Sequence, residues 1–269
     1  MTLWIAAYAA LGLFSGFFAG LLGIGGGAVM VPILALLFAA QDFPHSEIMH
    51  LALGSSMATI LFTSLSSLGS HHRHQAVRWE VVRQFTPGIL VGTLVGAVIA
   101  RVVDTTVLAT IFTAFIAANA INLFLDRKPP PNRSLPGPAG LSIAGLVIGT
   151  FSSLVAIGGA ALSVPYMTWC NVRIQQAIGT AAALGFPIAL GGSLGYILNG
   201  LHATDLPPGS LGYLFLPALF ALVPCGMIMA PVGARYAHRL PVATLKKIFA
   251  TVLVVLAAKM LHGLMQTGQ

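Results

Sequence analysis

Two glycine-rich breaks carry the most suggestive chemistry in this chain of 269 residues. Gly25-Gly26-Gly27 and Gly158-Gly159-Ala160 each interrupt an apolar stretch. Glycine tolerates positive φ and leaves backbone N–H groups uncovered. The first N–H groups of the helix that follows have no intrahelical partner, and the helix dipole adds partial positive charge there. Each break therefore predicts a backbone site for an anion that needs no Lys or Arg.

Other features near the breaks allow two interpretations each. The glycines themselves can instead serve close helix packing, as small residues do in membrane proteins. Pro32 and Pro165 follow the first glycine of each break by seven residues. A proline inside a helix frees a carbonyl group and weakens the helix, which is consistent with a gating role or with a tolerated kink.

Hydroxyl groups occur at matching places in two later apolar segments, Gly54-Ser55-Ser56 and Gly179-Thr180-Ala181. The hydroxyls of Ser55, Ser56 and Thr180 can donate to an anion. They can also bond the carbonyl groups of their own helix. We include them among the candidate substrate-binding residues, together with the two glycine breaks.

The two breaks belong to an internal repeat. Segments 16–32 and 149–165 have the same residue at nine positions, and 52–58 pairs with 177–183. The prolines of the polar segment 126–138 prevent a continuous helix through the join. Interrupted helices at corresponding places in two halves are typical of transporters, whose binding site lies between the halves.

Composition places the chain in a membrane. Hydrophobic residues make up 57% and charged residues 7% of it, whereas a soluble domain has about 25% charged residues. The formal net charge of +7 comes from Lys and Arg in short loops, where such residues orient a membrane protein. We therefore expect the lipid bilayer as a partner, and no nucleic acid.

Loop charge predicts the topology. The loops around 70–83, 126–138 and 235–247 are rich in Lys and Arg and should be cytoplasmic, whereas those around 41–47 and 201–210 contain acids and neither Lys nor Arg. Segment 3–39 has 37 residues, so a straight helix would reach about 55 Å across a core of about 30 Å. If it is a hairpin that returns to its own side, each half has three further spans, and this odd number inverts the second copy.

The sequence thus predicts an all-α integral membrane protein with two inverted repeats, each a glycine-broken hairpin plus three transmembrane helices, and with both termini outside. Whether the hairpins cross fully or are re-entrant stays open. The expected first repeat is 1–125, with a hairpin at 3–39 and helices near 48–68, 84–100 and 106–125. A cytoplasmic linker is expected at 126–138. The expected second repeat is 139–269, with a hairpin at 139–170 and helices near 174–198, 211–230 and 243–265.

The distribution of ionisable residues argues against catalysis. No Asp or Glu lies well inside a predicted helix, and no His-Glu-x-x-His pattern occurs. His71, His72 and His74 lie in a predicted loop without a neighbouring carboxylate or cysteine, so we interpret them as a solvated basic loop. We expect a small anionic substrate, no metal, no cofactor and no enzymatic activity.

The motif Gly-Leu-Leu-Gly-Ile-Gly-Gly-Gly-Ala-Val-Met-Val-Pro at 20–32 resembles the signature of the TauE/SafE sulfite-exporter family. The segments 52–58, 64–67, 72–79 and 177–189 are similar to later parts of the same family. The resemblance covers nearly the whole chain. It implies a multi-pass transporter of sulfur-containing anions, such as sulfite or organosulfonates, in the bacterial inner membrane. Two departures from the family pattern are Ala160 in the second break and Ala181 after Thr180.

We therefore expect an alternating-access exporter that holds its anion at two converging helix N-termini. A passive anion channel with the same site is the first alternative. An integral membrane enzyme is the second, for which Ser55, Ser56 and the loop histidines are the candidate catalytic groups.

Overall fold

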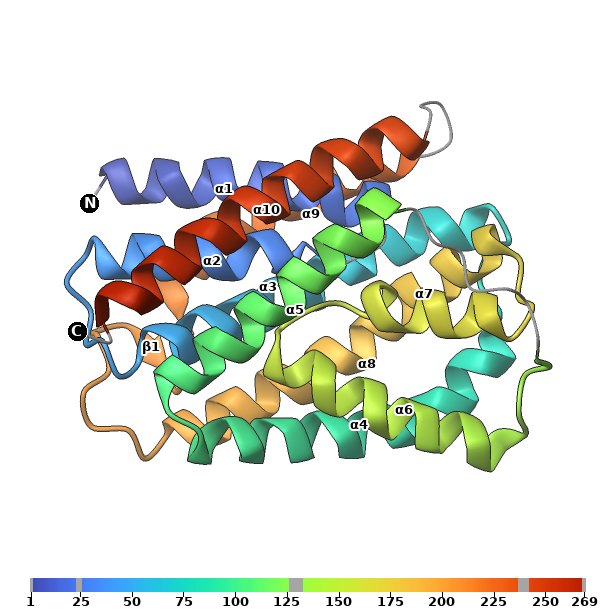
Figure 1. Ribbon diagram of the computed structural model, residues 1–269, viewed down its shortest axis with the longest axis horizontal. Coiled ribbons are helices and arrows are strands. Elements are labelled where there is room, and N and C mark those ends of the chain that lie inside the picture. Colours follow the sequence, from blue (N-terminus) through green and yellow to red (C-terminus); the bar gives the residue numbers. More distant parts are fainter. Residues whose placement is uncertain (1, 23–25, 126–132, 237–241, 268–269) are drawn as a thin grey trace.

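Nearly every apolar segment is a helix in the computed structural model, which describes residues 2–22, 26–125, 133–236 and 242–267. The described residues form ten helices and one short β-hairpin (Figure 1). The first half contains α1 (Thr2–Leu22), α2 (Gly27–Ala39), α3 (Ile48–Arg73), α4 (Trp79–Val102) and α5 (Thr105–Leu125). The second half contains α6 (Pro138–Leu154), α7 (Ala160–Trp169), α8 (Ile174–Gly200), β1 (Ser210–Leu211), β2 (Leu214–Phe215), α9 (Leu216–Tyr236) and α10 (Val242–Thr267).

Seven of the described helices are long and apolar enough to cross a bilayer, namely α1, α3, α4, α5, α8, α9 and α10. Their outer faces carry large apolar side chains such as those of Phe220, Ile228 and Ile121, which are 80%, 67% and 58% exposed. In water so much exposed apolar surface would favour association, whereas lipid tails cover it at no cost. The prediction of an all-α membrane protein is confirmed at this level.

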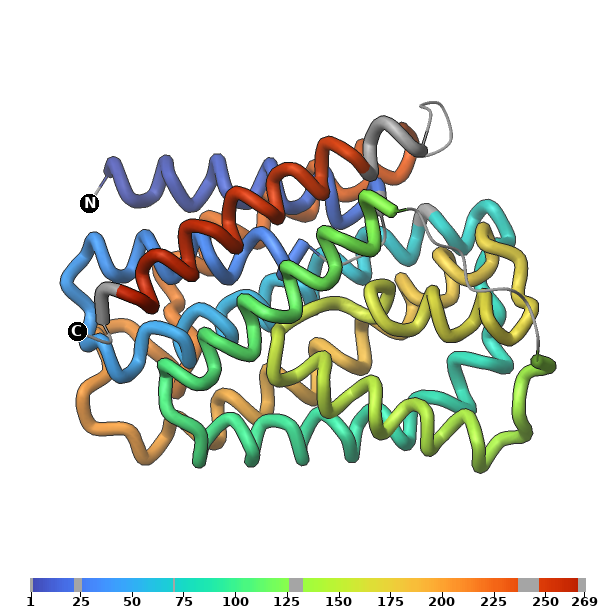
Figure 2. Tube along the Cα trace, viewed as in Figure 1, coloured from blue at the N-terminus to red at the C-terminus, as the bar shows by residue number. Residues whose placement is uncertain are grey.

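Two long helices, α3 and α8, form the centre of the molecule, and they cross in contact with each other. Around them α1 packs against α9, α4 against α6, and α5 against α10. Each of these contacts joins one half of the chain to the other. By position in the repeat, α6 corresponds to α1 and α4 corresponds to α9, so the α1–α9 and α6–α4 contacts are equivalent. In Figure 2, α1 begins at the left end and α6 at the right end, and α3 and α8 begin at the same two ends respectively.

Close backbone contact holds the outer pairs together. A Cβ atom on Gly20 of α1 would overlap with the carbonyl group of Ala230 in α9. A Cβ atom on Gly88 of α4 would likewise overlap with the carbonyl group of Ser142 in α6. Small residues at these positions let two helices approach closely, which is how helices associate in a bilayer.

Four approximate helix boundaries differ from the structure by five or six residues, and one of them is the end of the helix expected near 211–230, which lies at Tyr236. The helix expected from 211 begins at Leu216, because Gly209 and Gly212 take positive φ of 86° and 55° and turn the chain into the β1–β2 hairpin. The helix expected from 84 begins at Trp79, where Glu80 in the first turn favours a helix start. The helix expected to end at 68 continues to Arg73, since polar residues remain helical where a span emerges from the bilayer.

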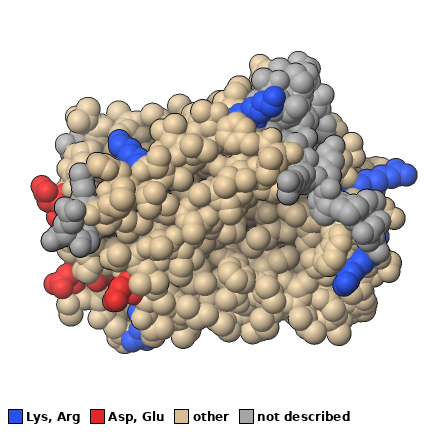
Figure 3. All heavy atoms as spheres, in the orientation of Figure 1, with Lys and Arg blue, Asp and Glu red and all other residues tan. Residues whose placement is uncertain are grey.

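The two ends of the molecule differ in charge. The acidic side chains visible in Figure 3 lie at the end where α1 begins and α10 finishes. We call this the acidic end, although basic side chains are also visible there in Figure 3; it contains the loops that follow α2, α4 and α8, with Asp42, Glu47, Asp104 and Asp205, and Arg101 in the last turn of α4. We call the other the basic end; it contains the α3–α4 loop, the residues before α6, the α7–α8 loop and the end of α9, with Arg73, Arg78, Arg83, Arg133, Arg173 and Arg235.

Candidate functional site

The first glycine break is packed against the chain that enters the second. Gly25 lies outside the described residues. Gly26 caps α2 with a positive φ of 74°, and its carbonyl accepts from Val29 N–H at 3.2 Å. A Cβ atom on Gly27 would overlap with the carbonyl oxygen of Ala156, two residues before Gly158. The first break therefore contacts the chain just before the second break in the interior of the molecule.

The second break lies against α8. Its left-handed residue is Ala156, with φ of 42°, and Gly159 has ordinary right-handed backbone angles. A Cβ atom on Gly159 would lie 2.8 Å from the carbonyl oxygen of Ala181 and 3.3 Å from the backbone nitrogen of Gly185. Since both atoms belong to the α8 backbone, the break has no room for a side chain at this position.

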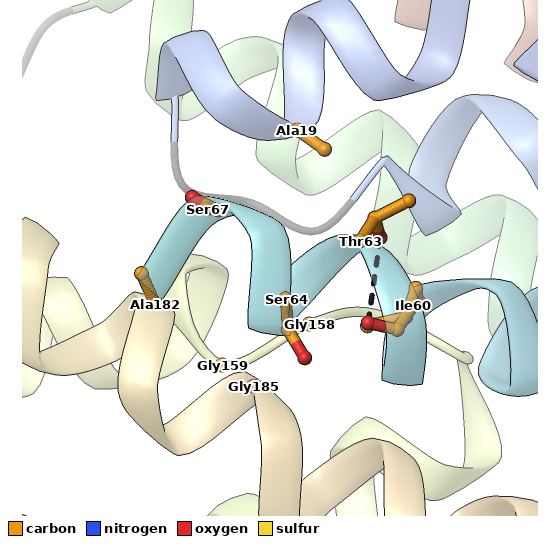
Figure 4. Close-up of a pocket in the computed structure, with 9 residues that line it drawn as sticks. All are labelled: Ala19, Ile60, Thr63, Ser64, Ser67, Gly158, Gly159, Ala182 and Gly185. Carbon is orange, nitrogen blue, oxygen red and sulfur yellow. Dashed lines mark hydrogen bonds between the residues drawn. The ribbon is translucent and has the colours of Figure 1, made fainter. Parts of the chain in front are cut away.

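A small cavity lies beside the second break (Figure 4). It encloses about 260 Å³ of space not filled by atoms, including its open mouth, yet its enclosed part has room for about one water molecule. Gly158 and Gly159 line it, whereas Gly26 and Gly27 do not. The remaining lining residues come from α1, α3 and α8 and are Ala19, Ile60, Thr63, Ser64, Ser67, Ala182 and Gly185.

The cavity presents hydrogen-bond donors and no charged side chain. The Ser67 hydroxyl is buried, with the residue 4% exposed, and it has no partner in the described part of the chain. The Ser64 hydroxyl donates to the carbonyl group of Leu61 at 3.0 Å, and that of Thr63 donates to Thr59 at 3.2 Å. An oxyanion that accepts hydrogen bonds suits such a wall better than a cation does.

Backbone amides at the start of α7 add to these donors. The first bond into this helix runs from Ser163 N–H to the carbonyl of Gly159, at 2.9 Å. Ala160, Ala161 and Leu162 precede that bond, and among the described residues no acceptor is found for their N–H groups. Ala160 is itself buried, at 3% exposed. Because the helix dipole is positive here, the start of α7 is chemically suited to an anion.

The hydroxyls of Ser55 and Thr180 are occupied elsewhere. Ser55 Oγ accepts from the backbone N–H of Phe215, at 2.9 Å, directly before α9. Thr180 Oγ1 accepts from the backbone N–H of Arg78, at 3.0 Å, directly before α4. Both side chains are fully buried and neither lines the cavity. Ser56 is also fully buried away from the cavity, and its hydroxyl has no partner among the described residues.

The glycines next to these hydroxyls complete the same contact. A Cβ atom on Gly54 would overlap with the carbonyl oxygen of Tyr213, and one on Gly179 would lie 2.6 Å from that of Ala76. We call each glycine–hydroxyl pair, with the segment it holds, a helix-entry contact. The two contacts are equivalent in the two halves, since α9 corresponds to α4, and they fix where those helices begin.

The first helix-entry contact lies beside a buried titratable group. Burial raises the pKa of the Tyr213 phenol to about 12, and nearby Glu47 acts in the same direction. The Tyr213 ring also stacks on His50, with ring centroids 4.9 Å apart. The phenol therefore stays neutral at physiological pH.

The two predicted gating prolines lie inside the helices that follow the breaks. Pro32 is buried in α2, and Pro165 is half-buried in α7. Neither can donate to the carbonyl group four residues earlier. The Thr168 hydroxyl bonds the carbonyl of Pro165 at 3.0 Å, so hydroxyl groups satisfy part of the α7 backbone after the proline.

The residue that sequence reasoning missed is Ser67, together with its neighbours on α3. Ile60, Thr63, Ser64 and Ser67 follow the i, i+3, i+4, i+7 spacing of one helix face. That pattern was available in the sequence as a polar stripe on an apolar helix. In the described residues no three or more His, Cys, Asp or Glu side chains lie close enough together to hold a metal ion.

Comparison with known proteins agrees with this architecture. The family model for the sulfite exporter TauE/SafE matches residues 8–260. A "Probable membrane transporter protein" of Haemophilus influenzae is 36% identical over 252 residues, covering 93% of this chain and 95% of that protein. "Probable membrane transporter protein YdhB" of Bacillus subtilis is 30% identical, covering 88% and 92%, respectively. No solved structure matches. The chain belongs to the sulfite exporter TauE/SafE family.

Proposed function

We propose that this multi-pass membrane transporter moves small sulfur-containing anions, such as sulfite or organosulfonates, out of a bacterial cell by alternating access. The observation that carries the proposal is the packing of Gly27 on Ala156, close to a cavity that is lined by Gly158, Gly159 and the unpartnered hydroxyl of Ser67. The family model is described as a sulfite exporter, which supports this class of substrate. We further propose the bacterial inner membrane as its location.

In this proposal the anion is held mainly at the second break. Gly158 and Gly159 line the cavity, Ala160 supplies the first backbone amide of α7, and Ser67 supplies a hydroxyl without another partner in the described residues. The Gly25-Gly26-Gly27 break contributes from the opposite side, because Gly27 is packed on Ala156. Ser55 and Thr180 act one step away, by fixing α3 and α8 against the starts of α9 and α4.

An inverted repeat would supply the two access states. Two observations support this architecture. The contact of α1 with α9 is equivalent to the contact of α6 with α4, and α1 and α6 begin at opposite ends of the molecule. We propose that the basic end faces the cytoplasm, because Lys and Arg concentrate in its loops. Pro32 and Pro165 would then weaken α2 and α7 where each must move.

The small size of the cavity favours a carrier over a passive channel. Its enclosed part has room for about one water molecule, and a sulfite ion is larger. An anion can therefore pass only after the walls move, as a carrier's walls do in every transport cycle. With the cytoplasm negative, the membrane potential favours outward movement of an anion by about 2.3 kcal/mol per charge per 100 mV.

The test is transport in proteoliposomes that contain the purified protein. Sulfite or a sulfonate inside the vesicles should accelerate uptake of the labelled anion, because a carrier exchanges substrate and a channel does not. Gly159→Leu should abolish this exchange, since the α8 backbone fills the space beside Gly159.

The matched control for that variant is Gly69→Ala. Gly69 is exposed on α3, and a Cβ atom there would meet nothing within 4 Å, so exchange should be retained. Absence of saturable flux for every sulfur-containing anion in the wild-type protein would contradict the proposal. Flux without exchange acceleration would favour the channel.

A further inference from the structure

The cavity has a counterpart in the other half of the molecule, and that counterpart is filled. The repeat aligns 52–58 with 177–183, so residues of α3 correspond to residues of α8 that are 125 positions later. The two helix-entry contacts support this alignment, because Gly54 with Ser55 and Gly179 with Thr180 make the same contacts on α9 and α4. Positions on the two central helices can therefore be compared one by one.

Ser67 of α3 and Ala182 of α8 are two of the small residues that line the cavity. They lie near one another at one side of the cavity in Figure 4. Both belong to the halves of their helices that lie toward the basic end, because α3 finishes there and α8 begins there. The cavity thus extends from the middle of the molecule toward the basic end.

The counterparts of these two residues are Gly192 and Met57, and they meet. A Cβ atom on Gly192 would lie 3.1 Å from both Cε and Sδ of Met57. The Met57 side chain is fully buried, at 0% exposed. On the side toward the basic end, the short side chain of Ala182 lines the cavity. On the side toward the acidic end, the side chain of Met57 packs against Gly192.

The remaining walls differ in the same direction. Thr63 and Ser64, which line the cavity, correspond to Ile188 and Ala189, which are both fully buried. The counterpart region is therefore apolar as well as filled. An unbranched, flexible side chain such as that of methionine can swing out of such a region and return to it.

We propose that Met57 is the gate residue that closes the path between the binding site and the acidic end. This inference rests on the proposed carrier mechanism and assigns one side chain to one of its two access steps. The described structure is then closed toward the acidic end, and opening on that side requires Met57 to move away from Gly192. Ala182, its counterpart, has no side chain long enough to fill the corresponding space beside the cavity.

The inference can be tested by cysteine labelling without any transport assay. Cys170 and Cys225 are free thiols, so both are first replaced by alanine. Ser67→Cys then reports on the cavity, and Ala189→Cys, the counterpart of Ser64, reports on the closed side. Ser67 and Ala189 are 4% and 0% exposed, so in detergent solution a small polar thiol reagent should label both cysteines slowly, and Ser67→Cys faster than Ala189→Cys.

Adding Met57→Ala should raise the labelling rate of Ala189→Cys by at least about tenfold, equivalent to 1.4 kcal/mol of opening free energy. The same change should leave Ser67→Cys labelling unaltered. Met57→Leu is the matched control, because it keeps the side-chain volume and should keep Ala189→Cys protected. Equal labelling of Ala189→Cys with methionine and alanine at position 57 would overturn the inference.

A reciprocal variant protects the test against misfolding. Ala182→Met should fill the cavity and slow labelling of Ser67→Cys by a similar factor, which a merely loosened protein would not do. Unchanged labelling of Ser67→Cys in this variant would also overturn the inference. Failure of the proposed function appears separately, as absent sulfite or sulfonate exchange in a protein whose labelling pattern still follows Met57 and Ala182.

Discussion

The two glycine breaks share a sequence pattern, but they differ in backbone conformation and in surroundings. Gly26 takes a left-handed φ of 74°, whereas the corresponding Gly159 has a φ of −51°. In the second break the left-handed residue is Ala156. Gly27 is closed in by the Ala156 carbonyl, while Gly158 and Gly159 line a cavity.

This difference explains why the second break tolerates Ala160 where the first has Gly27. A methyl group at 27 would overlap with the Ala156 carbonyl group, whereas the methyl group of Ala160 is accommodated in a buried position at the start of α7. Two copies of one motif can thus occupy different states in one structure. In an inverted-repeat carrier, exchanging those states between the halves is what would change the side of access.

The largest effect should come from Gly27→Ala. Overlap with the Ala156 carbonyl must move the backbone of one break, and overpacking of this kind costs about 3 kcal/mol. The reverse change at the equivalent position, Ala160→Gly, should cost only about 0.5–1 kcal/mol through helix propensity. Thermal unfolding in detergent measures both. Similar melting temperatures for the two variants would refute the stated difference between the breaks.

The helix-entry contacts should show a smaller and graded effect. Ser55→Ala leaves the buried N–H of Phe215 without its acceptor, at an expected cost of about 2 kcal/mol. Thr180→Val removes the acceptor of the half-buried Arg78 N–H, for which about 1 kcal/mol is expected because water can partly replace the bond. Denaturation of the two variants in parallel gives the order, and the reverse order would contradict this assignment.

Two serines of the cavity wall should differ in anion affinity. Ser67→Ala removes an unpartnered donor, so anion binding should weaken by about tenfold, which corresponds to the roughly 1.5 kcal/mol of a hydrogen bond to a charged group. Ser64→Ala should have less effect, because that hydroxyl already donates to Leu61. Titration calorimetry with sulfite measures both affinities. If Ser67→Ala binds sulfite as tightly as the wild type does, the Ser67 hydroxyl does not donate to the anion.

The smallest effect concerns Ala156. A non-glycine residue at a φ of 42° is strained, so Ala156→Gly should stabilise the protein by up to about 1 kcal/mol. Ala160→Gly should have the opposite sign, as stated above. The sign of the change in melting temperature distinguishes them, and destabilisation by Ala156→Gly would mean that the second break is not strained there.

The sequence was enough to predict the helical membrane fold and the family, because both depend on long-range patterns of apolar residues and on motifs. It missed the β1–β2 hairpin, since Leu211, Leu214 and Phe215 look like the continuation of an apolar helix. The left-handed Gly209 and Gly212 are the signal that breaks it. Local apolarity alone cannot distinguish a helix start from a buried turn.

The candidate site was less predictable. Both glycine breaks could be found, but their contact through Gly27 and Ala156 depends on packing between segments more than a hundred residues apart. The free hydroxyl of Ser67 could not be distinguished from the self-bonded one of Ser64, because a side-chain rotamer decides between them. Ser55 and Thr180 were expected at the anion, and in the structure the hydroxyl oxygen of each accepts from a backbone N–H. Contact with an anion stays a prediction for both.

The most direct test of the central claim is the affinity of the purified protein for sulfite before and after Gly159→Ala, with Gly69→Ala as control. The claim is that backbone amides at the second break hold the anion, and a methyl group on Gly159 would lie 2.8 Å from the Ala181 carbonyl and displace that break. We predict saturable binding in the wild-type and Gly69→Ala proteins, and at least about a tenfold loss, or 1.4 kcal/mol, in Gly159→Ala. Equal affinity in all three would contradict the account.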